Sequence, residues 1–589
     1  MSAKFFIFIQ TLSVQMTTRA FALCMLLACA RPYSQAQTAS RYDLVIDEIL
    51  ADPSPPAGLP ASEFIEIRNM SGQSFNLRNW KISDQSTTAS IRTDFILQPD
   101  SFVVLCSSSA ATAYANFGPS VGVTGFPSLD NEGDLIMLHS PEGVLVHAVA
   151  YQSGWYRNNL KKEGGWTLEM IDCKNPCGGA DNWQASISDR GGTPGTINSV
   201  NGSRPDESLP SLLRTYTIDS MTIVAVFDEP LDSLTASAAD HYQLNNEIGM
   251  PVSASLLPPL FNEVRLVLGT SLKPETVYEL LALNFFDCAG NPAGPRHTAK
   301  VALPGRAERM DLVINEILFN PKADGYDYVE FYNRSNKAID LGDLFIAKRD
   351  AVNGIVSQQT LSTGPRLLFP GEYAVTTENS QWLQEEFLVK QPGQILQLAG
   401  LPSMPDDHGN ILLADRQGNI LDELQYDHSW HFALLNAEEG VALERMDYRK
   451  ATQDPTNWTS AASTSGYGTP TYQNSQFITA VAGAGTVSIQ PKIFSPDNDG
   501  YDDYCLIRYQ LPMPGYVASI TLFDIAGKPV RYLLQNRILG QEGNFRWDGL
   551  GEKQKKLPVG IYVVLTELFN LEGDSKRIMN TVTLARKFE

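Results

Sequence analysis

Four aspartates lie within seven residues near the end of the chain: Asp497, Asp499, Asp502 and Asp503. Carboxylates this close repel one another unless their oxygens face solvent or a hard cation such as Ca²⁺. The run is not an EF-hand, because the twelfth position counted from Asp497 is Arg508, where that loop needs a glutamate. The pattern therefore predicts either a calcium site, with calcium as the one candidate cofactor, or an Asx-type turn that enters a strand.

The cysteines suggest structural chemistry. Cys173 and Cys177 are spaced for a small disulfide in an oxidising compartment, which would stiffen a loop. Their spacing suits neither a zinc ribbon nor a redox Cys-x-x-Cys motif. Cys106, Cys288 and Cys505 have the pattern of isolated strand residues, so we expect them to be buried as small apolar groups.

The other reactive side chains do not assemble into a recognisable catalytic motif. His428 and His431 flank Trp430 and leave two interpretations open, a transition-metal site or loop histidines beside a packed tryptophan. Two histidines without further ligands leave a metal site incomplete. The sequence shows no nucleophile elbow, papain-like signature, P-loop or dinucleotide fingerprint. We therefore predict that the protein is not an enzyme.

The N-terminus has the pattern of a secretory signal peptide. Residues 1–36 contain no Asp or Glu, Arg19 precedes an apolar run over residues 20–30, and Ala36 supplies a small residue for cleavage. The run is shorter than the roughly 20 residues that a membrane span needs. Lipidation at Cys29 is the alternative. The pattern predicts a secreted or outer cell-surface protein.

Composition limits the classes of partner. The chain has 589 residues, enough for several domains, and its 43% hydrophobic and 19% charged residues predict folded ones. The formal net charge of -21 argues against a nucleic-acid partner, since phosphate binding needs clustered cations. No later apolar run is long enough to span a membrane, so we expect no transmembrane segment.

A long internal repeat organises the chain. The matched segments are 43–50 with 311–318, 63–71 with 327–335, 130–138 with 406–414, and the Gly-Thr-Pro elements 192–194 and 468–470. Each copy reads as short strands between turns, with a helix expected only near 381–387. The pattern predicts an all-β fold of tandem sandwiches. Glu48, Glu66, Glu316 and Glu330 recur at matched positions and are interpreted as structural or surface partners.

At these segments the chain resembles the lamin-tail domain family. The shared marks are I-x-E-I-x-x-x-P, the strand E-F/Y-I/V-E-I/F-x-N-x-S and the closing N-W…G-T-P. The resemblance implies an immunoglobulin-like sandwich with an adhesive or anchoring role, and it supplies no catalytic residues. Loop aromatics such as Trp155, Tyr156 and Trp430 are either contact anchors or, as we prefer for the tryptophans, caps on the cores.

Two further modules complete the predicted organisation. The stretch between the copies resembles bacterial Ig-like modules with V-x-F-x-E-P-L and D-x-A-G-N-P signatures, which implies a rigid spacer. The last stretch resembles C-terminal Ig-like domains of the gliding-associated and flagellar hook-capping type, including type IX sorting domains. The predicted ranges are 1–36 signal peptide, 38–200 first lamin-tail-like domain, 203–304 Ig-like domain, 308–475 second lamin-tail-like domain and 486–589 attachment or sorting domain.

These features predict an exported protein with a non-catalytic binding, adhesion or display role. Its partner would be an unidentified protein or surface polymer, and the last domain would engage the secretion machinery. Two alternatives stay open, an accessory protein of an extracellular nuclease or other hydrolase, and a structural matrix component.

Overall fold

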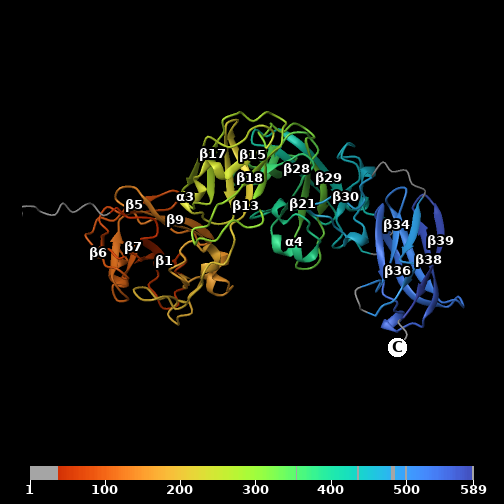
Figure 1. Ribbon diagram of the computed structural model, residues 1–589, viewed down its shortest axis with the longest axis horizontal. Helices are drawn as coiled ribbons and strands as arrows, with labels where there is room; N and C mark the ends of the chain where they lie inside the picture. The colour runs from red at the N-terminus through yellow and green to blue at the C-terminus, as the bar shows by residue number, and fades with distance from the viewer. Residues whose placement is uncertain are drawn as a thin grey trace, which may run out of the picture.

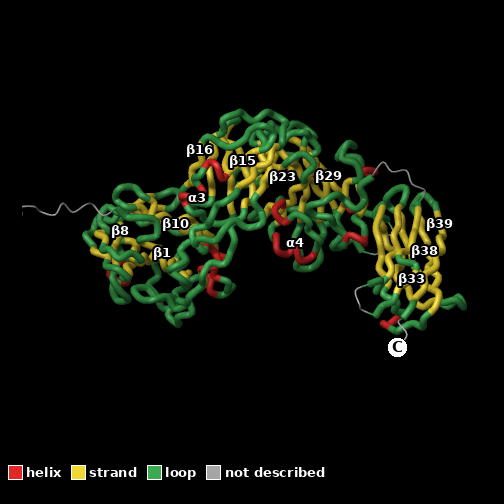
Figure 2. The backbone as a smooth tube through the Cα atoms, in the orientation of Figure 1, coloured by secondary structure: helices red, strands yellow, loops and turns green. Residues whose placement is uncertain are grey.

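The computed structural model describes residues 38–586 except 353, 434, 436, 479–484 and 498–500. Its strands form four groups in chain order, and every sheet draws its strands from one group alone. The groups, here called the first to fourth modules, hold strands within residues 44–185, 212–301, 312–460 and 486–584. They follow one another in an arch along the long axis (Figures 1 and 2). The predicted all-β fold of tandem sandwiches is confirmed.

The first module packs a six-stranded sheet, ordered β12-β11-β1-β2-β7-β8, against a four-stranded sheet, ordered β10-β9-β4-β5. The larger sheet comprises β1 (Leu44–Leu50), β2 (Phe64–Asn69), β7 (Phe102–Ser107), β8 (Ser120–Val123), β11 (Leu168–Met170) and β12 (Trp183–Ala185). The smaller comprises β4 (Lys81–Ser83), β5 (Thr88–Ser90), β9 (Gly133–His139) and β10 (Leu145–Gln152). A short pair, β3 (Phe75–Asn76) and β6 (Ile96–Leu97), and helix α2 (Ala111–Tyr114) complete it.

The third module repeats this topology, with sheets ordered β27-β26-β21-β20-β30-β31 and β24-β23-β28-β29. The larger sheet comprises β20 (Leu312–Leu318), β21 (Tyr328–Asn333), β26 (Tyr373–Thr377), β27 (Ile395–Gln397), β30 (Leu443–Arg445) and β31 (Trp458–Ser460). The smaller comprises β23 (Leu344–Asp350), β24 (Gly354–Thr360), β28 (His408–Asp415) and β29 (Ile420–Asp427), beside the pair β22 (Ile339–Asp340) and β25 (Leu367–Leu368). The two sequence copies therefore fold alike, and the predicted helix is α4 (Ser380–Glu386).

The second and fourth modules are smaller. The second has sheets β13-β14-β17-β16 and β15-β18-β19, formed by β13 (Leu212–Asp219), β14 (Thr222–Phe227), β15 (Tyr242–Leu244), β16 (Ser253–Leu257), β17 (Glu263–Val267), β18 (Tyr278–Ala282) and β19 (Thr298–Val301), with helix α3 (Ser233–Ala236). The fourth has sheets β32-β34-β37 and β33-β39-β38-β35-β36, formed by β32 (Thr486–Gln490), β33 (Ile493–Phe494), β34 (Cys505–Gln510), β35 (Tyr516–Phe523), β36 (Pro529–Leu539), β37 (Glu542–Trp547), β38 (Gly560–Phe569) and β39 (Ser575–Leu584).

The large sheet of each repeated module is buried on both faces. Every residue of β1 and of β20 is buried. In an antiparallel sheet with one face in solvent, the residues along a strand would instead alternate between buried and exposed. In the first module one face meets the sandwich core, with Leu44, Ile46 and Ile49. The other face is covered by α2 and by the closing segment after β12. This second cover explains why glutamates occur inside these strands: they meet protein, not water.

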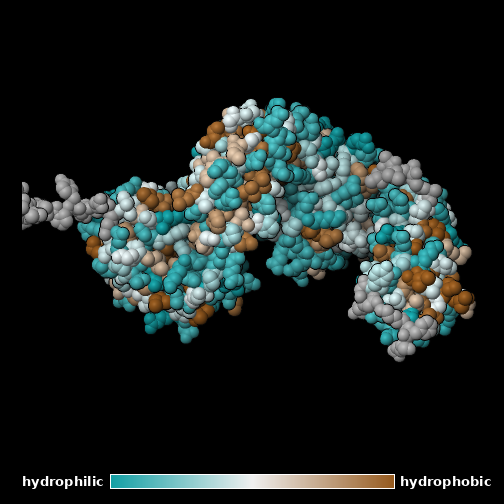
Figure 3. Space-filling model, in the orientation of Figure 1, coloured by the Kyte–Doolittle hydropathy of each residue, from teal (hydrophilic) through white to brown (hydrophobic). Residues whose placement is uncertain are grey.

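The face of the molecule drawn in Figure 3 is mainly hydrophilic, with scattered apolar patches. The described part of the fourth module exposes Ile493, Ile561 and Met579, the last with 75% of its surface accessible. Across the described residues, no helix has the length and apolar character needed to cross a membrane.

Candidate functional site

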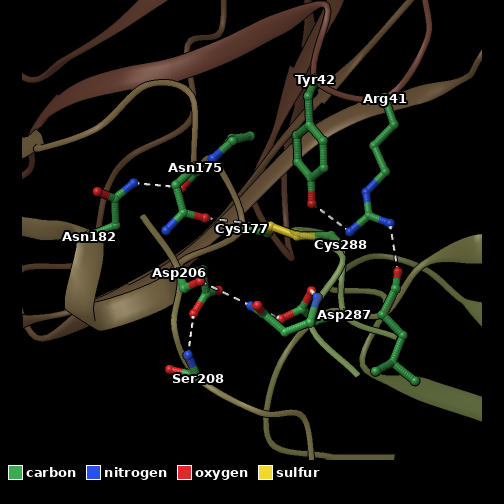
Figure 4. Close-up of a disulfide and its surroundings, with 12 residues drawn as sticks. Arg41, Tyr42, Asn175, Cys177, Asn182, Asp206, Ser208, Asp287 and Cys288 are labelled. Atoms are coloured by element: carbon green, nitrogen blue, oxygen red, sulfur yellow. Dashed lines mark hydrogen bonds between the residues drawn. A yellow bond between two sulfur atoms is a disulfide. The ribbon is translucent and has the colours of Figure 1, made fainter. Parts of the chain in front are cut away.

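A disulfide joins the first module to the second. Cys177, in the loop before β12, is bonded to Cys288, in the loop after β18, with 6.6 Å between their Cα atoms (Figure 4). The predicted Cys173–Cys177 disulfide is therefore wrong, and so is the expectation that Cys288 is an isolated buried thiol. Cys173 is a free thiol whose Sγ receives a hydrogen bond from Arg68. Cys106 and Cys505 are free and buried, as expected.

Arg41 of the first module also contacts the second module near the disulfide. Its Nη1 donates to the carbonyl of Leu231 in the second module at 3.3 Å, and its guanidinium lies 4.0 Å from the ring centroid of Phe261. The neighbouring Tyr42 receives a second hydrogen bond from Arg41 on its hydroxyl. A planar cation between two aromatic rings, with donors directed to a carbonyl, fixes both distance and orientation. The disulfide and Arg41 thus hold two modules as one unit.

Carboxylates converge beside the disulfide. Asp206, Glu229 and Asp287 place ligand oxygens within 4.8 Å of one another, the one such acidic or metal-ligating triplet in the described part of the chain. Asp287 is fixed by Asn291, which donates from its backbone nitrogen and from Nδ2, and Asn291 also donates to the Asp206 carbonyl. Burial, as the larger cause, and the nearby Asp206, Asp287 and Asp228 together raise the pKa of Glu229 to about 8.

Two cavities meet at this junction. One has a volume of about 250 Å³ and a mainly apolar wall that includes Tyr42, Trp155, Trp183 and Phe261. The other has a volume of about 660 Å³ and lies among polar and acidic groups, including Asp206 and Asp228. Both are lined by Cys177, Gly179, Ala180, Asp228, Glu229 and Pro230, so they form one crevice, here called the junction crevice.

The junction crevice is built by segments that strand ends position. In the second module, Asp228 and Glu229 follow the end of β14, and Phe261 stands in the turn between β16 and β17. In the first module, Trp155 belongs to the 3-10 turn η1 (Ser153–Tyr156), directly after β10. Binding residues are commonly carried by loops on a rigid scaffold, and this crevice has that construction.

The predicted calcium residues lie at one end of the fourth module. Asp497 and Asp502 are exposed, and the backbone of Ser495 donates to the Asp502 carbonyl. Asp503 is half-buried just before β34. Asp499 lies outside the described residues. Calcium binding at this loop therefore stays a prediction.

The recurrent glutamates form buried triads, not surface partners. In the first module Glu48 lies in register with Glu66 on one neighbouring strand and with Glu169 on the other. In the third module Glu316 is paired in the same way with Glu330 and Glu444. All six are completely buried. We call these sets the first and the second glutamate triad; each is covered by the closing Gly-Thr-Pro segment of its module.

The first triad grips its closing segment by hydrogen bonds. The backbone nitrogen of Thr193 donates to Glu48 at 2.7 Å, and the Thr193 hydroxyl donates to Glu169 at 2.9 Å. The backbone nitrogen of Gly195 donates to Glu66. Burial raises the pKa of Glu48 and of Glu66 well above the ordinary value, with the neighbouring carboxylates adding to the increase. These hydrogen bonds hold the closing segment against the buried glutamates of the large sheet.

The second triad grips Thr469 and Thr471 in the same manner. Thr469 donates from its nitrogen to Glu316 at 2.8 Å and from its hydroxyl to Glu316 and Glu444. Burial, as the larger cause, and the Glu316 charge together raise the pKa of Glu444 to about 8. The two modules therefore share one internal device, and the resemblance between the copies extends to their buried polar groups.

The histidines and loop tryptophans have separate partners. His431 is buried against Ser460 at 2.8 Å and burial lowers its pKa to about 4, whereas His428 faces Glu438 at 3.2 Å. Neither belongs to a metal-ligating triplet of the described residues. Trp155 packs beside Trp183 at the core of the first module, and Trp430 packs on the core of the third. The tryptophans cap their cores, and Trp155 also lines the junction crevice.

The geometry defines a class: a chain of β-sandwich modules in which two large, equivalent units enclose glutamate triads. The family described as Lamin Tail Domain matches residues 37–153 and 306–428, one segment in each large unit. The resemblance seen in the sequence is thereby confirmed for those two regions. A search of curated proteins finds no match.

Several solved structures share limited similarity with the chain. The N-terminal part of the bacterial S-layer protein SbsC is 14% identical over 28% of this chain and 40% of its own, with a TM-score of 0.16. PorZ, a surface component of the type IX secretion system of Porphyromonas gingivalis, is 10% identical over 77% and 56%, with a TM-score of 0.16. A Ca²⁺-stabilized adhesin with which an Antarctic bacterium binds ice is 9% identical over 93% and 100%, with a TM-score of 0.12. The chain spans between 40% and 55% of the length of the first S-layer chains it matches.

Sequence reasoning missed the junction crevice. Glu229 and Asp287 belong to the two signatures by which the second module is recognised, and both were treated as marks of a fold. Their separation of more than fifty residues hides that they meet. In the sequence Asp287 directly precedes Cys288, but Asp206 and Glu229 lie far from any cysteine, so no local signal points to their meeting.

Proposed function

We propose that the protein is exported and works outside the cytoplasm as a non-catalytic binding or display protein, with its modules forming a semi-rigid arm. The observation that carries the proposal is the Cys177–Cys288 disulfide between two modules. Disulfides persist in oxidising compartments and are rare in the cytosol. The signal-peptide pattern of residues 1–36 and the string of β-sandwich modules support the same conclusion.

Binding, not catalysis, suits the arrangement of polar groups. The glutamate triads are enclosed and engaged by closing segments, so no substrate reaches them. An accessible concave site is present at the junction crevice, whose walls come from two modules. In this proposal the fourth module attaches the arm to the cell surface or directs its export.

Cell fractionation of the full-length protein and of a truncation ending before Val487 tests the proposal. We expect the full-length protein on the cell surface or in the medium, with the disulfide intact under non-reducing conditions, and we expect the truncation to be retained inside. Full-length protein in the cytosol with reduced Cys177 and Cys288 would overturn the export proposal. A truncation that reaches the surface would remove the attachment role of the fourth module alone.

A further inference from the structure

The junction crevice combines features that point to a ligand. Its smaller cavity, of about 250 Å³, is large enough for an apolar side chain and is walled by aromatic rings. Its wider part is bordered by carboxylates from the linker and the second module, namely Asp206, Asp228 and Glu229. The two parts share one wall, so a single extended ligand reaches both.

The acidic groups on that shared wall are poorly compensated: burial and mutual repulsion raise the pKa of Glu229 to about 8, and a cation bound beside it would restore the ionised form. Among the described residues, Glu229 accepts no hydrogen bond and forms no ion pair, and the charged groups that act on it are Asp206, Asp287 and Asp228, all acidic. The nearest cations have other partners. Arg41 is held by Leu231, Tyr42 and Phe261, while Arg157 and Arg204 lie at Asp181. Arg41 and Arg204 also line the crevice, but acidic residues outnumber them. A concave site with a surplus of one sign of charge and low-dielectric walls attracts a ligand of the opposite sign.

We propose that the junction crevice binds an extended peptide segment of a partner protein in which a lysine or arginine neighbours an aromatic or branched apolar residue. The apolar side chain occupies the cavity beside Trp155 and Phe261, and the cationic group lies at Asp228 and Glu229. This site rests on the proposed binding function and names the class of its partner. Charge complementarity selects this occupant: an acidic or purely apolar segment would leave the carboxylates without a counter-charge.

The covalent link between the modules makes the site suitable for binding. Cys177 lines both parts of the crevice and is bonded to Cys288, so the two walls keep their separation before a ligand arrives. Arg41 fixes the same separation about the aromatic wall. Pre-organisation of this kind increases affinity, because less conformational freedom is lost on binding.

The test uses fluorescence anisotropy with the purified, oxidised full-length protein. The probes are three fluorescein-labelled peptides: alternating lysine and phenylalanine, alternating glutamate and phenylalanine, and alternating lysine and glycine. We expect saturable binding of the first, and affinities at least about tenfold weaker for the other two. Equal binding of all three, or no binding of the first, would overturn the proposal.

Matched variants locate the binding. The double variant Asp228→Asn and Glu229→Gln is expected to weaken binding about tenfold, whereas Asp219→Asn, at the end of β13 that is paired with the start of β14, leaves it unchanged. Ala180→Trp, on the exposed rim, is expected to block the crevice, while Ala113→Trp, on exposed α2, is its control. Circular dichroism confirms the folding of each variant. Equal effects of target and control variants would contradict the site.

Calcium binding is the alternative that the test must distinguish from peptide binding. The clustered carboxylate oxygens of Asp206, Glu229 and Asp287 also suit a divalent cation. Millimolar CaCl₂ is expected to alter peptide binding no more than an equal ionic strength of KCl. If Ca²⁺ alone binds tightly and displaces the peptide, the junction is a metal site and the peptide proposal fails. Since all these measurements use purified protein, they stand apart from the fractionation that tests export.

Discussion

The first and second glutamate triads solve the same structural problem with different partners. In the second triad every carboxylate oxygen accepts a hydrogen bond, and Glu316 and Glu330 each gain one from a side chain that the first module lacks: the hydroxyl of Tyr328 and Nδ2 of Asn315. In the first module these positions hold Phe64 and Asp47. There, Glu48 Oε2 and Glu66 Oε1 are buried without a partner among the described residues.

The difference shows two ways to keep acids inside a sheet. A buried carboxylate without donors is costly, and its pKa rises until the neutral form is favoured. A neutral carboxyl carries its own donor, so protonation supplies in the first module part of what Tyr328 and Asn315 supply in the third. The pKa values of triad carboxyls are raised in both modules. The first module should depend more strongly on pH because it also buries Asp47, where the third has Asn315, and the third should depend more strongly on particular side chains.

The largest expected effect breaks an ion pair that the third module alone contains. Arg445 is completely buried, lies 3.5 Å from Asp422, and donates to the Ile314 carbonyl and to Thr452; Met170 and His147 stand at the matching positions of the first module. Arg445→Met leaves a buried carboxylate without its cation and should cost about 3–5 kcal/mol of unfolding free energy. Hydrogen exchange of the backbone amides in β20 and β30 measures this loss of stability.

The double variant Arg445→Met with Asp422→His serves as the control. It recreates the pair of the first module, in which His147 Nδ1 accepts from the Ile46 backbone. We expect it to recover much of the lost protection. A single variant as stable as the wild type would show that the ion pair contributes nothing.

The next effect concerns Asp47, the bulge residue of β1. Burial raises its pKa from 3.8 to about 7, with Arg68 opposing the shift. The folded state therefore holds this proton more tightly than the unfolded state, so its stabilisation is complete below pH 4 and is lost as the pH rises through 7. Asp47→Asn should add stability of the order of 3 kcal/mol at pH 8 and little at pH 4.

Calorimetry at the two pH values checks this expectation, with the first module's transition identified by its response to the variant. Asn315→Asp is the reciprocal change and should introduce the same pH dependence into the third module. An Asp47→Asn gain that is equal at both pH values would contradict the assigned cause.

Removal of one donor from the second triad should have a smaller effect. Tyr328→Phe deletes the hydroxyl that donates to Glu316 and leaves the aromatic packing against Phe387. Loss of one hydrogen bond to a buried acceptor should cost about 1–3 kcal/mol. Urea denaturation followed by tryptophan fluorescence measures the change, and an unaltered midpoint would show that the hydroxyl is dispensable.

The smallest effect is a gain. Phe64→Tyr places a hydroxyl in the first module where Tyr328 has one, near Glu48. We expect a gain of about 1 kcal/mol, because a hydrogen bond to a partnerless oxygen is offset by the desolvation of the new group. Denaturation of the variant beside Tyr328→Phe measures both signs in one experiment. A loss of stability would mean that the space above Phe64 does not admit the hydroxyl.

The sequence predicted what repetition and local pattern encode. The matched segments around Ile49 and Ile317 predicted equivalent strands, and the apolar spacing near Leu383 predicted α4. It did not predict that Glu48 and Glu316 are enclosed, because the cover comes from Thr193 and Thr469, about 150 residues away. Whether a charged residue is buried depends on such distant segments. The alternation of apolar and polar residues along a strand carries no information about them.

The sequence did not predict the junction crevice, for a related reason. Cys177 lies four residues from Cys173 but 111 residues from Cys288, and local spacing favoured the near partner. The true pairing follows from how two modules pack, as does the meeting of Glu229 with Asp206. Local chemistry identified the candidate residues, while inter-module packing decided their partners.

The Cys177–Cys288 link also determines how the arm responds to tension. Force applied at the two ends passes directly from Cys177 to Cys288, so the enclosed stretch, which includes most of the second module, is bypassed. Pulling on the oxidised protein would leave that stretch unextended. After reduction, unfolding of the stretch would add about 380 Å of contour length, at roughly 3.4 Å per residue. If the protein works as the proposed surface arm, the bond would limit how far it lengthens under load.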